Sequence, residues 1–213
     1  MRTDPFTDAV LFLAGDTDDH HRLGLLGVAL AATFALALVA SLAIAVANWR
    51  ADPLQRRGVN LWLWFVRLLM GAMWFEGSLW KLPLPVADGL RYWTEQLRDN
   101  SAFVWHHQFV TDFLLPNLIW LGPLVWLTEF AMGLALVLGF AVRLAGIVGI
   151  LFTANIWIGV YHNTGEWPWT YAFIMLIEGT LVALRAGHAL GLDAIVARRP
   201  GLGAFARLHR LAS

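Results

Sequence analysis

The chain has 213 residues, of which 59% are hydrophobic and 14% charged, and its mean hydropathy is +0.61. This composition lies outside the range of ordinary soluble domains and indicates a membrane protein. The 15 basic and 15 acidic side chains cancel, so no basic field favours nucleic acid, and nucleic-acid binding is excluded. The absence of cysteine excludes disulfides, thiolate metal sites and dithiol redox chemistry within the chain.

Five apolar segments are long enough to cross the roughly 30 Å hydrocarbon core of a bilayer as helices. We expect these spans at 23–48, 60–82, 117–140, 143–162 and 168–187. The first follows an acidic leader, residues 1–22, and is much longer than the apolar region of a signal peptide, so we expect it to be retained. The predicted fold class is therefore an all-α, polytopic membrane protein.

The distribution of basic residues predicts the orientation of the spans. One side of the membrane receives nine arginines, which are Arg50, Arg56, Arg57, Arg143, Arg185, Arg198, Arg199, Arg207 and Arg210. The other side holds Arg2, Arg22, Lys81, Arg91 and Arg98 together with most of the acids. We predict a multi-pass protein of the cell membrane, in contact with its lipids, with the N-terminus outside and the C-terminus in the cytoplasm.

Three connecting segments complete the predicted organisation. The first span and the basic cytoplasmic loop that follows it together make up residues 23–59. The connection 83–116 alternates charged and aromatic residues at helical spacing, which predicts one or two amphipathic helices on the outer surface. The basic tail, 200–213, suits the anionic inner leaflet.

Ionisable residues inside the spans are costly in lipid and therefore need partners. Arg67, Glu129 and Glu178 are expected at a similar depth, where one guanidinium can bridge two carboxylates. This predicted ion cluster is either a structural clasp or a proton or ligand site. Glu76 points almost opposite to Arg67 around the second span, so the two are not expected to serve one site.

Tryptophans are concentrated in the predicted outer half of the spans. An interfacial belt explains many of them, and an aromatic-walled pocket is the alternative. Such a pocket would suit a planar ring with polar edges, such as a quinone head group. Its candidate binding residues are Glu76, Lys81, Trp74, Trp80 and Trp157.

The histidines are expected at the surface or at the mouth of this pocket. His106 and His107 are adjacent and cannot both face one site on a regular helix. No ligand spacing typical of a metal site and no cofactor-binding motif occurs in the sequence, so we predict no metal and identify no catalytic residue.

Three segments resemble the DoxX/DoxD-like family of membrane proteins: RLLMGAMWFEGSLWKL at 67–82, EFAMGLALVLGFAVRLAGIVGIL at 129–151 and LRAGHALGLDAIVARR at 184–199. The resemblance covers residues 60–199 and implies a four-helix membrane domain, to which the first span is an addition. The positions shared with the family pattern are Arg67, Gly71, Gly77, Lys81, Glu129, Gly133, Gly139, Arg143 and Asp193.

The resemblance also implies a role in membrane redox complexes, since the family includes the small membrane subunit of thiosulfate:quinone oxidoreductase. One hypothesis is therefore a quinone-linked subunit that receives electrons from a partner protein. The alternative is a non-catalytic accessory subunit that docks onto a larger respiratory or photosynthetic complex. The small residues Gly24, Gly27, Ala31 and Ala35 of the first span would supply its contact face.

Overall fold

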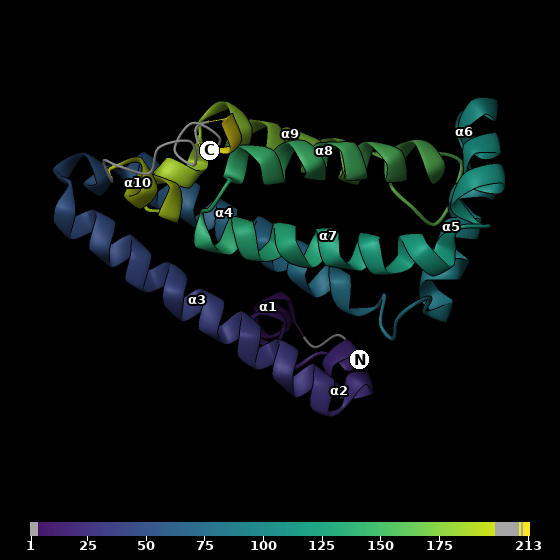
Figure 1. The fold of residues 1–213 in the computed structure, drawn as a ribbon, viewed down its shortest axis with the longest axis horizontal. Helices are drawn as coiled ribbons and strands as arrows, with labels where there is room; N and C mark the ends of the chain where they lie inside the picture. The colour runs from purple at the N-terminus through teal and green to yellow at the C-terminus, as the bar shows by residue number, and fades with distance from the viewer. Residues whose placement is uncertain (1–3, 199–208, 210) are drawn as a thin grey trace.

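The computed structural model describes residues 4–198, 209 and 211–213 (Figure 1). Most of the predicted basic tail, including Arg207 and Arg210, and also Arg199, therefore lies outside the described residues. The regular secondary structure of the described residues is entirely helical, with no β-strand.

The N-terminal half begins with two short helices, α1 (Pro5–Ala14) and α2 (Asp18–Leu23). Two long helices follow, α3 (Leu25–Ala51) and α4 (Gly58–Leu79), joined by the 3-10 helix η1 (Pro53–Arg56). The connection 83–116 contains α5 (Asp88–Asp99), α6 (Val104–Phe109) and the π-helical turn η2 (Val110–Leu114). The helices in this connection match the amphipathic helices expected from its sequence.

The C-terminal half contains α7 (Leu118–Leu138), α8 (Val142–Gly159) and α9 (Trp169–Ala183). The 3-10 helix η3 (Ala186–His188) and the short helix α10 (Leu192–Ala197) follow. Gly139 ends α7 in the left-handed conformation, with φ +71°, which a glycine adopts without steric cost.

Four of the helices, α3, α4, α7 and α8, are long and apolar enough to cross a membrane, which identifies the chain as a membrane protein. Their bounds fall within a few residues of the first four predicted spans. The fifth predicted span, 168–187, is only partly helical: α9 has 15 residues and is about 22 Å long at 1.5 Å per residue. It is apolar but shorter than the other four.

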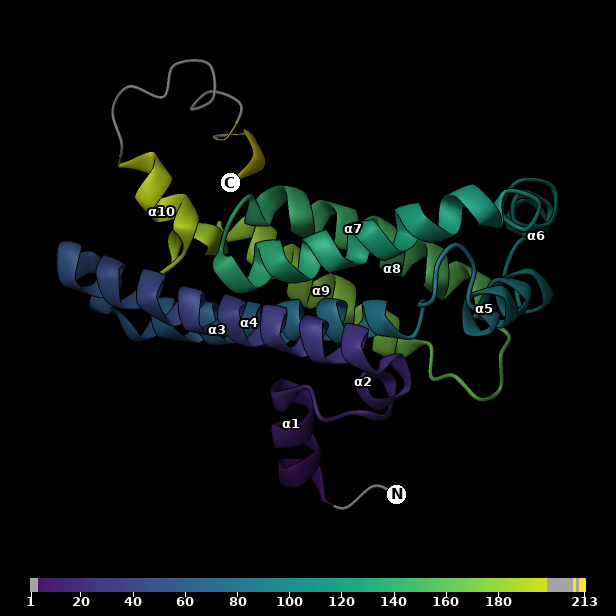
Figure 2. The ribbon, with the colours of Figure 1, turned by 60° about the horizontal axis from the view of Figure 1, so that its bottom comes forward.

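The long helices form two layers with α3 on one side (Figures 1 and 2). Helix α4 packs along α7, and α8 packs along α9. Helix α3 lies against α4 and α7: the Phe34 ring stacks on Phe75 with 4.8 Å between centroids, and the Ser41 hydroxyl donates to the Val137 carbonyl at 2.6 Å. These contacts bury one side of the first span against the other helices.

One end of the bundle, here called the η3 end, is held by Arg67 and Asp193. The Arg67 Nη1 donates to the carbonyls of Ala186 and Ala189, at 2.6 and 3.2 Å. The Asp193 carboxylate accepts the backbone N–H of Ala141 at 2.8 Å and so caps the beginning of α8. The C-terminal segment is thereby fixed to the turn between α7 and α8. The opposite end, which carries α5 and α6, is called the α5 end.

Candidate functional site

A buried ion pair joins α7 to the end of α4. The Lys81 Nζ lies 2.5 Å from the Glu129 Oε2, and the two residues are only 5% and 3% exposed. The ammonium group also donates to the Gly77 carbonyl at 2.7 Å and lies 3.9 Å from the centroid of the Trp80 ring. Both charges are therefore compensated away from water, which is the condition under which a buried ion pair persists.

A cavity of about 560 Å³ lies next to this ion pair at the α5 end. Its size is typical of sites that bind small molecules. Aromatic and leucine side chains form most of its wall, and Lys81 and Glu129 both contribute to the lining. The aromatic residues of the wall are Trp80 beside α4, Trp93 from α5, Phe109 from α6, Phe152 from α8 and Tyr171 from α9.

A few further polar groups interrupt the apolar wall of the cavity. Thr94, Asn155, Glu166 and Tyr171 line it together with the ion pair. The Tyr171 hydroxyl donates to the Glu166 carboxylate at 2.8 Å, while the Thr94 hydroxyl donates to the Leu90 carbonyl. The cavity therefore combines a large apolar surface with a small number of fixed polar groups, as ring-binding sites do.

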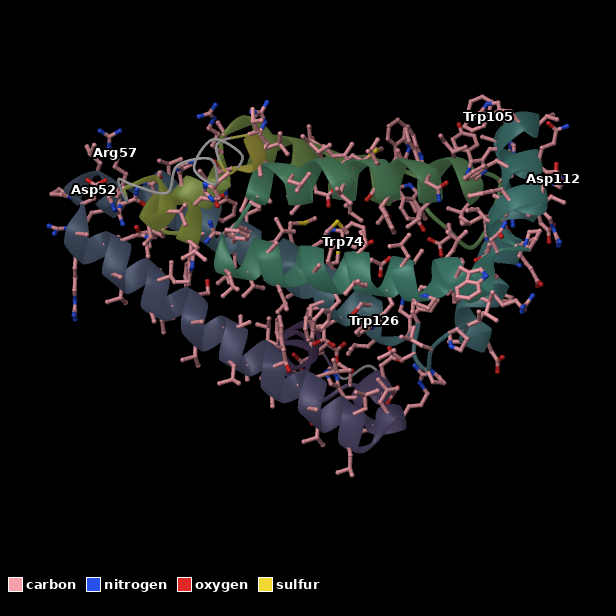
Figure 3. The ribbon with its side chains drawn as sticks, viewed as in Figure 1. Asp52, Arg57, Trp74, Trp105, Asp112 and Trp126 are labelled. Carbon is pink, nitrogen blue, oxygen red and sulfur yellow. The ribbon has the colours of Figure 1, made fainter. Side chains whose placement is uncertain are left out.

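Two of the five residues predicted for the ring site lie at this cavity. Lys81 and Trp80 line it, whereas Glu76, Trp74 and Trp157 do not. The Trp74 Nε1 donates to the Glu178 Oε1 at 2.7 Å, and its ring lies edge-on to Phe152. Trp74 therefore lies behind the cavity wall, between the two helix layers (Figure 3).

The predicted ion cluster of Arg67, Glu129 and Glu178 does not form. Arg67 contacts backbone carbonyls at the η3 end, Glu129 pairs with Lys81, and Glu178 accepts from Trp74. The assumption of a common depth was wrong because α4 begins beyond the end of α7. As a result, Arg67, nine residues into α4, lies against Gly139, the residue that ends α7.

Glu76 faces the N-terminal segment on the other side of α4. Its Oε2 lies 3.6 Å from the Nδ1 of His20, a buried residue of α2. Arg22, also in α2, donates to the Leu82 carbonyl beyond the end of α4 at 3.0 Å. The prediction that Glu76 and Arg67 serve different sites is confirmed, and the leader supplies the partner of Glu76.

The pKa of His20 is lowered from its ordinary value. Burial, which disfavours the charged imidazolium, is the main cause, and the neighbouring Asp19 and Asp16 oppose the shift in the pKa while His21 adds to it. The His20 Nδ1 also contacts the Thr17 hydroxyl at 2.8 Å. Docking of α2 on α4 thus depends on a histidine that burial keeps neutral.

The small-residue face predicted for partner contact on the first span is occupied in part by the same chain. A Cβ at Gly27 would lie 2.0 Å from the His20 carbonyl oxygen, so α2 folds directly onto α3 at this glycine. Ala31 faces Gly15 in the same way, with 2.8 Å from its Cβ to a Cβ built on Gly15. Gly24 and Ala35 are exposed.

Several residues of the cavity wall were not identified from sequence, although the sequence contained signals for them. Leu90, Trp93, Thr94 and Leu97 recur at helical spacing along the amphipathic α5. Asn155 is an isolated amide in an apolar helix. His106, expected at the surface or the cavity mouth, is 2% exposed.

Within the described residues, no group of three or more histidine, aspartate or glutamate side chains is placed to hold a metal ion. Comparisons with protein-family models, with curated proteins and with solved structures find no match to this chain.

Proposed function

We propose that the protein binds a quinone head group in the cavity at the α5 end and acts as the membrane subunit of a quinone-linked redox complex. The observation that carries the proposal is the buried Lys81–Glu129 ion pair in the wall of an otherwise apolar, aromatic cavity. A quinone is a flat apolar ring with carbonyl oxygens at its edge. The aromatic wall suits its faces, and the ammonium group suits a carbonyl oxygen.

The arrangement of the residues that carry the DoxX/DoxD-like resemblance supports this proposal. Lys81 pairs with Glu129, and Arg67 lies against Gly139, where a Cβ would lie 2.5 Å from its Nη1. Gly71 similarly faces Gly133, whose carbonyl oxygen would lie 2.8 Å from a Cβ at Gly71. Positions 48 or more residues apart in sequence thus meet as contacting pairs. Electrons for the quinone would come from a partner protein.

Under this proposal, the positions of the basic residues give the orientation of the bundle in the membrane. Arg56, Arg57, Arg143 and Arg185 all lie near the η3 end, as expected of a cytoplasmic face. The cavity then lies in the outer half of the bundle, beneath α5 and α6, and a quinone would bind near the outer surface of the cell membrane.

The proposal is tested by filling the cavity from one side. Leu121 of α7 lines it, so Leu121→Trp places an indole in the space for the ring. Leu127 lies on the same helix but is exposed, so Leu127→Trp is the matched control. Both proteins are reconstituted in lipid nanodiscs, and binding of a short-chain ubiquinone analogue is measured by calorimetry.

We expect Leu121→Trp to weaken binding by about tenfold or more, because a well-packed ring cannot share the cavity with an indole. Leu127→Trp and Glu76→Gln, which both lie outside the cavity, should bind as the unmodified protein does. Equal affinity in the Leu121 and Leu127 variants, or no binding by the unmodified protein, would contradict a quinone site in this cavity.

A further inference from the structure

One amide in the cavity wall, that of Asn155, has a nitrogen without a hydrogen-bond partner among the described residues. Asn155 of α8 lines the cavity, and its Oδ1 lies 3.1 Å from the Nε2 of His106. Among the described residues, the Asn155 Nδ2 has no hydrogen-bond partner, although it is not sealed from the cavity by neighbouring atoms. An amide nitrogen of this kind carries two N–H donors.

His106 is fixed from both sides. Its Nδ1 lies 2.8 Å from the Ser101 hydroxyl. On the other side its ring packs against Gly159, where an added Cβ would lie only 3.1 Å from the imidazole Cε1. The backbone N–H of Ala102 donates to the Ile158 carbonyl at 2.9 Å, which ties the segment before α6 to α8. The imidazole therefore keeps its position beside Asn155.

The hydrogen bonds give the Asn155 amide a direction. The Asn155 Oδ1 can only accept, so the proton of the neutral imidazole is on Nε2, which donates to it. The His106 Nδ1 then accepts from the Ser101 hydroxyl at 2.8 Å, a shorter contact than the 3.3 Å between that hydroxyl and the Phe103 carbonyl. The carbonyl oxygen of the amide is thereby used. Its two N–H donors remain for a group in the cavity, and that group must be an acceptor.

We propose that Asn155 is a specificity-determining residue that donates a hydrogen bond to a carbonyl oxygen of the bound ring, and that His106 is the positioning residue that sets the direction of its amide. This inference rests on the proposed quinone site and deepens it. Lys81, just beyond the end of α4, and Asn155 on α8 are donors from two different segments of the same cavity wall. The site therefore selects a ring with two carbonyl oxygens over a ring with one.

Two fused-ring compounds of similar size test this selectivity. Menadione has two ring carbonyls and tetralone has one. Affinity for each is measured by calorimetry in nanodiscs for the unmodified protein and for Asn155→Leu, which keeps the volume and removes the donor. We expect the unmodified protein to prefer menadione by about tenfold, the effect of one hydrogen bond in an apolar site, and Asn155→Leu to bind both alike.

The role of His106 is tested by the same preference ratio, which loss of stability alone would not change. His106→Leu should remove the preference, whereas His106→Gln, which retains an N–H donor, should restore part of it. His107→Leu, at the adjacent exposed position, should leave the preference intact.

The outcomes separate this inference from the proposed function. An unmodified protein that binds neither compound contradicts the quinone site itself. A protein that binds both compounds equally, or an Asn155→Leu variant that keeps the preference for menadione, overturns the selectivity assigned to Asn155. A His106→Leu variant that unfolds more easily but keeps the preference overturns the positioning role of His106.

Discussion

The His20 imidazole and the Glu76 carboxylate meet at 3.6 Å where the N-terminal segment contacts α4. Glu76 is one of two ionisable residues in α4, together with Arg67, and its partner comes from an acidic leader that lies outside the long helices. The charged groups near His20 are Asp16, Asp19 and His21 from its own segment. Because burial lowers the pKa of His20, the docked segment holds this ring in its neutral form.

Docking of the N-terminal segment should therefore weaken as the pH falls. In the undocked segment His20 takes up a proton near its ordinary pKa of about 6.5, whereas the docked form resists protonation until a lower pH. Below that ordinary pKa the undocked form binds more protons, so stability present at higher pH is lost on acidification. Hydrogen exchange of residues 17–27, corrected for intrinsic rates, should show less protection at about pH 5.5 than at about pH 7.5.

Two single substitutions identify the residue responsible for this pH dependence. His20→Gln should remove the difference in protection between the two pH values, because glutamine does not titrate. His21→Gln should keep the difference, since His21 is exposed and contacts Asp16 instead. The same pH dependence in both variants would assign the effect to another group.

At the scale of helices, the close crossing of α4 and α7 depends on two glycines. A Cβ at Gly71 would lie 2.8 Å from both the Gly133 carbonyl oxygen and the Val137 nitrogen. A Cβ at Gly133 would lie 2.7 Å from the Phe75 nitrogen. These short distances involve backbone atoms, which do not move aside cheaply. The two helices therefore approach closely because neither carries a side chain at the crossing.

We expect Gly71→Ala to lower stability by about 1–3 kcal/mol, because the added methyl group forces the two backbones apart. Gly77→Ala is a matched control on the same helix, where a Cβ would meet no atom within 4 Å. That substitution should be neutral or slightly stabilising, since alanine favours the helix over glycine. Midpoints of thermal unfolding in detergent give the comparison, and similar midpoints for both variants would refute the crossing as the cause.

The positions of the helices were predictable from sequence, but their rotation and relative depth were not. Apolar length located α3, α4, α7 and α8, and helical periodicity correctly separated Glu76 from Arg67. Glu129 was assigned to Arg67 because depth was counted from the expected ends of the spans. The pairing with Lys81 depends on how far α4 extends past α7, which is decided by packing between helices and not by either sequence segment alone.

The candidate site was harder to predict because its wall comes from five helices. The aromatic pocket was foreseen as an alternative, with Lys81 and Trp80 among its residues. Asn155 and Thr94 were missed because each is a single polar residue whose role depends on a neighbouring helix. His106 was expected at the surface or the cavity mouth, since nothing in its own segment shows that α6 turns it toward α8.

For the whole molecule, the proposed orientation can be tested with single cysteines, because the chain contains none. Asp112 and Arg57 are exposed and lie at opposite ends of the bundle (Figure 3). In intact cells, a maleimide that cannot cross membranes should label Asp112→Cys. It should label Arg57→Cys only after the membrane is permeabilised. The reverse pattern would place the N-terminus inside.

The partners of α4 have a consequence for biogenesis. This helix is the least apolar of the four candidate spans, and two of its polar side chains find their partners in segments synthesised later: Trp74 in Glu178 of α9, and Arg67 in the carbonyls of Ala186 and Ala189. Until those segments leave the ribosome, α4 has unpaired polar groups that lipid does not tolerate. We therefore expect α4 to remain beside the translocon until most of the chain has been translated, so that membrane integration is completed by the C-terminal segments.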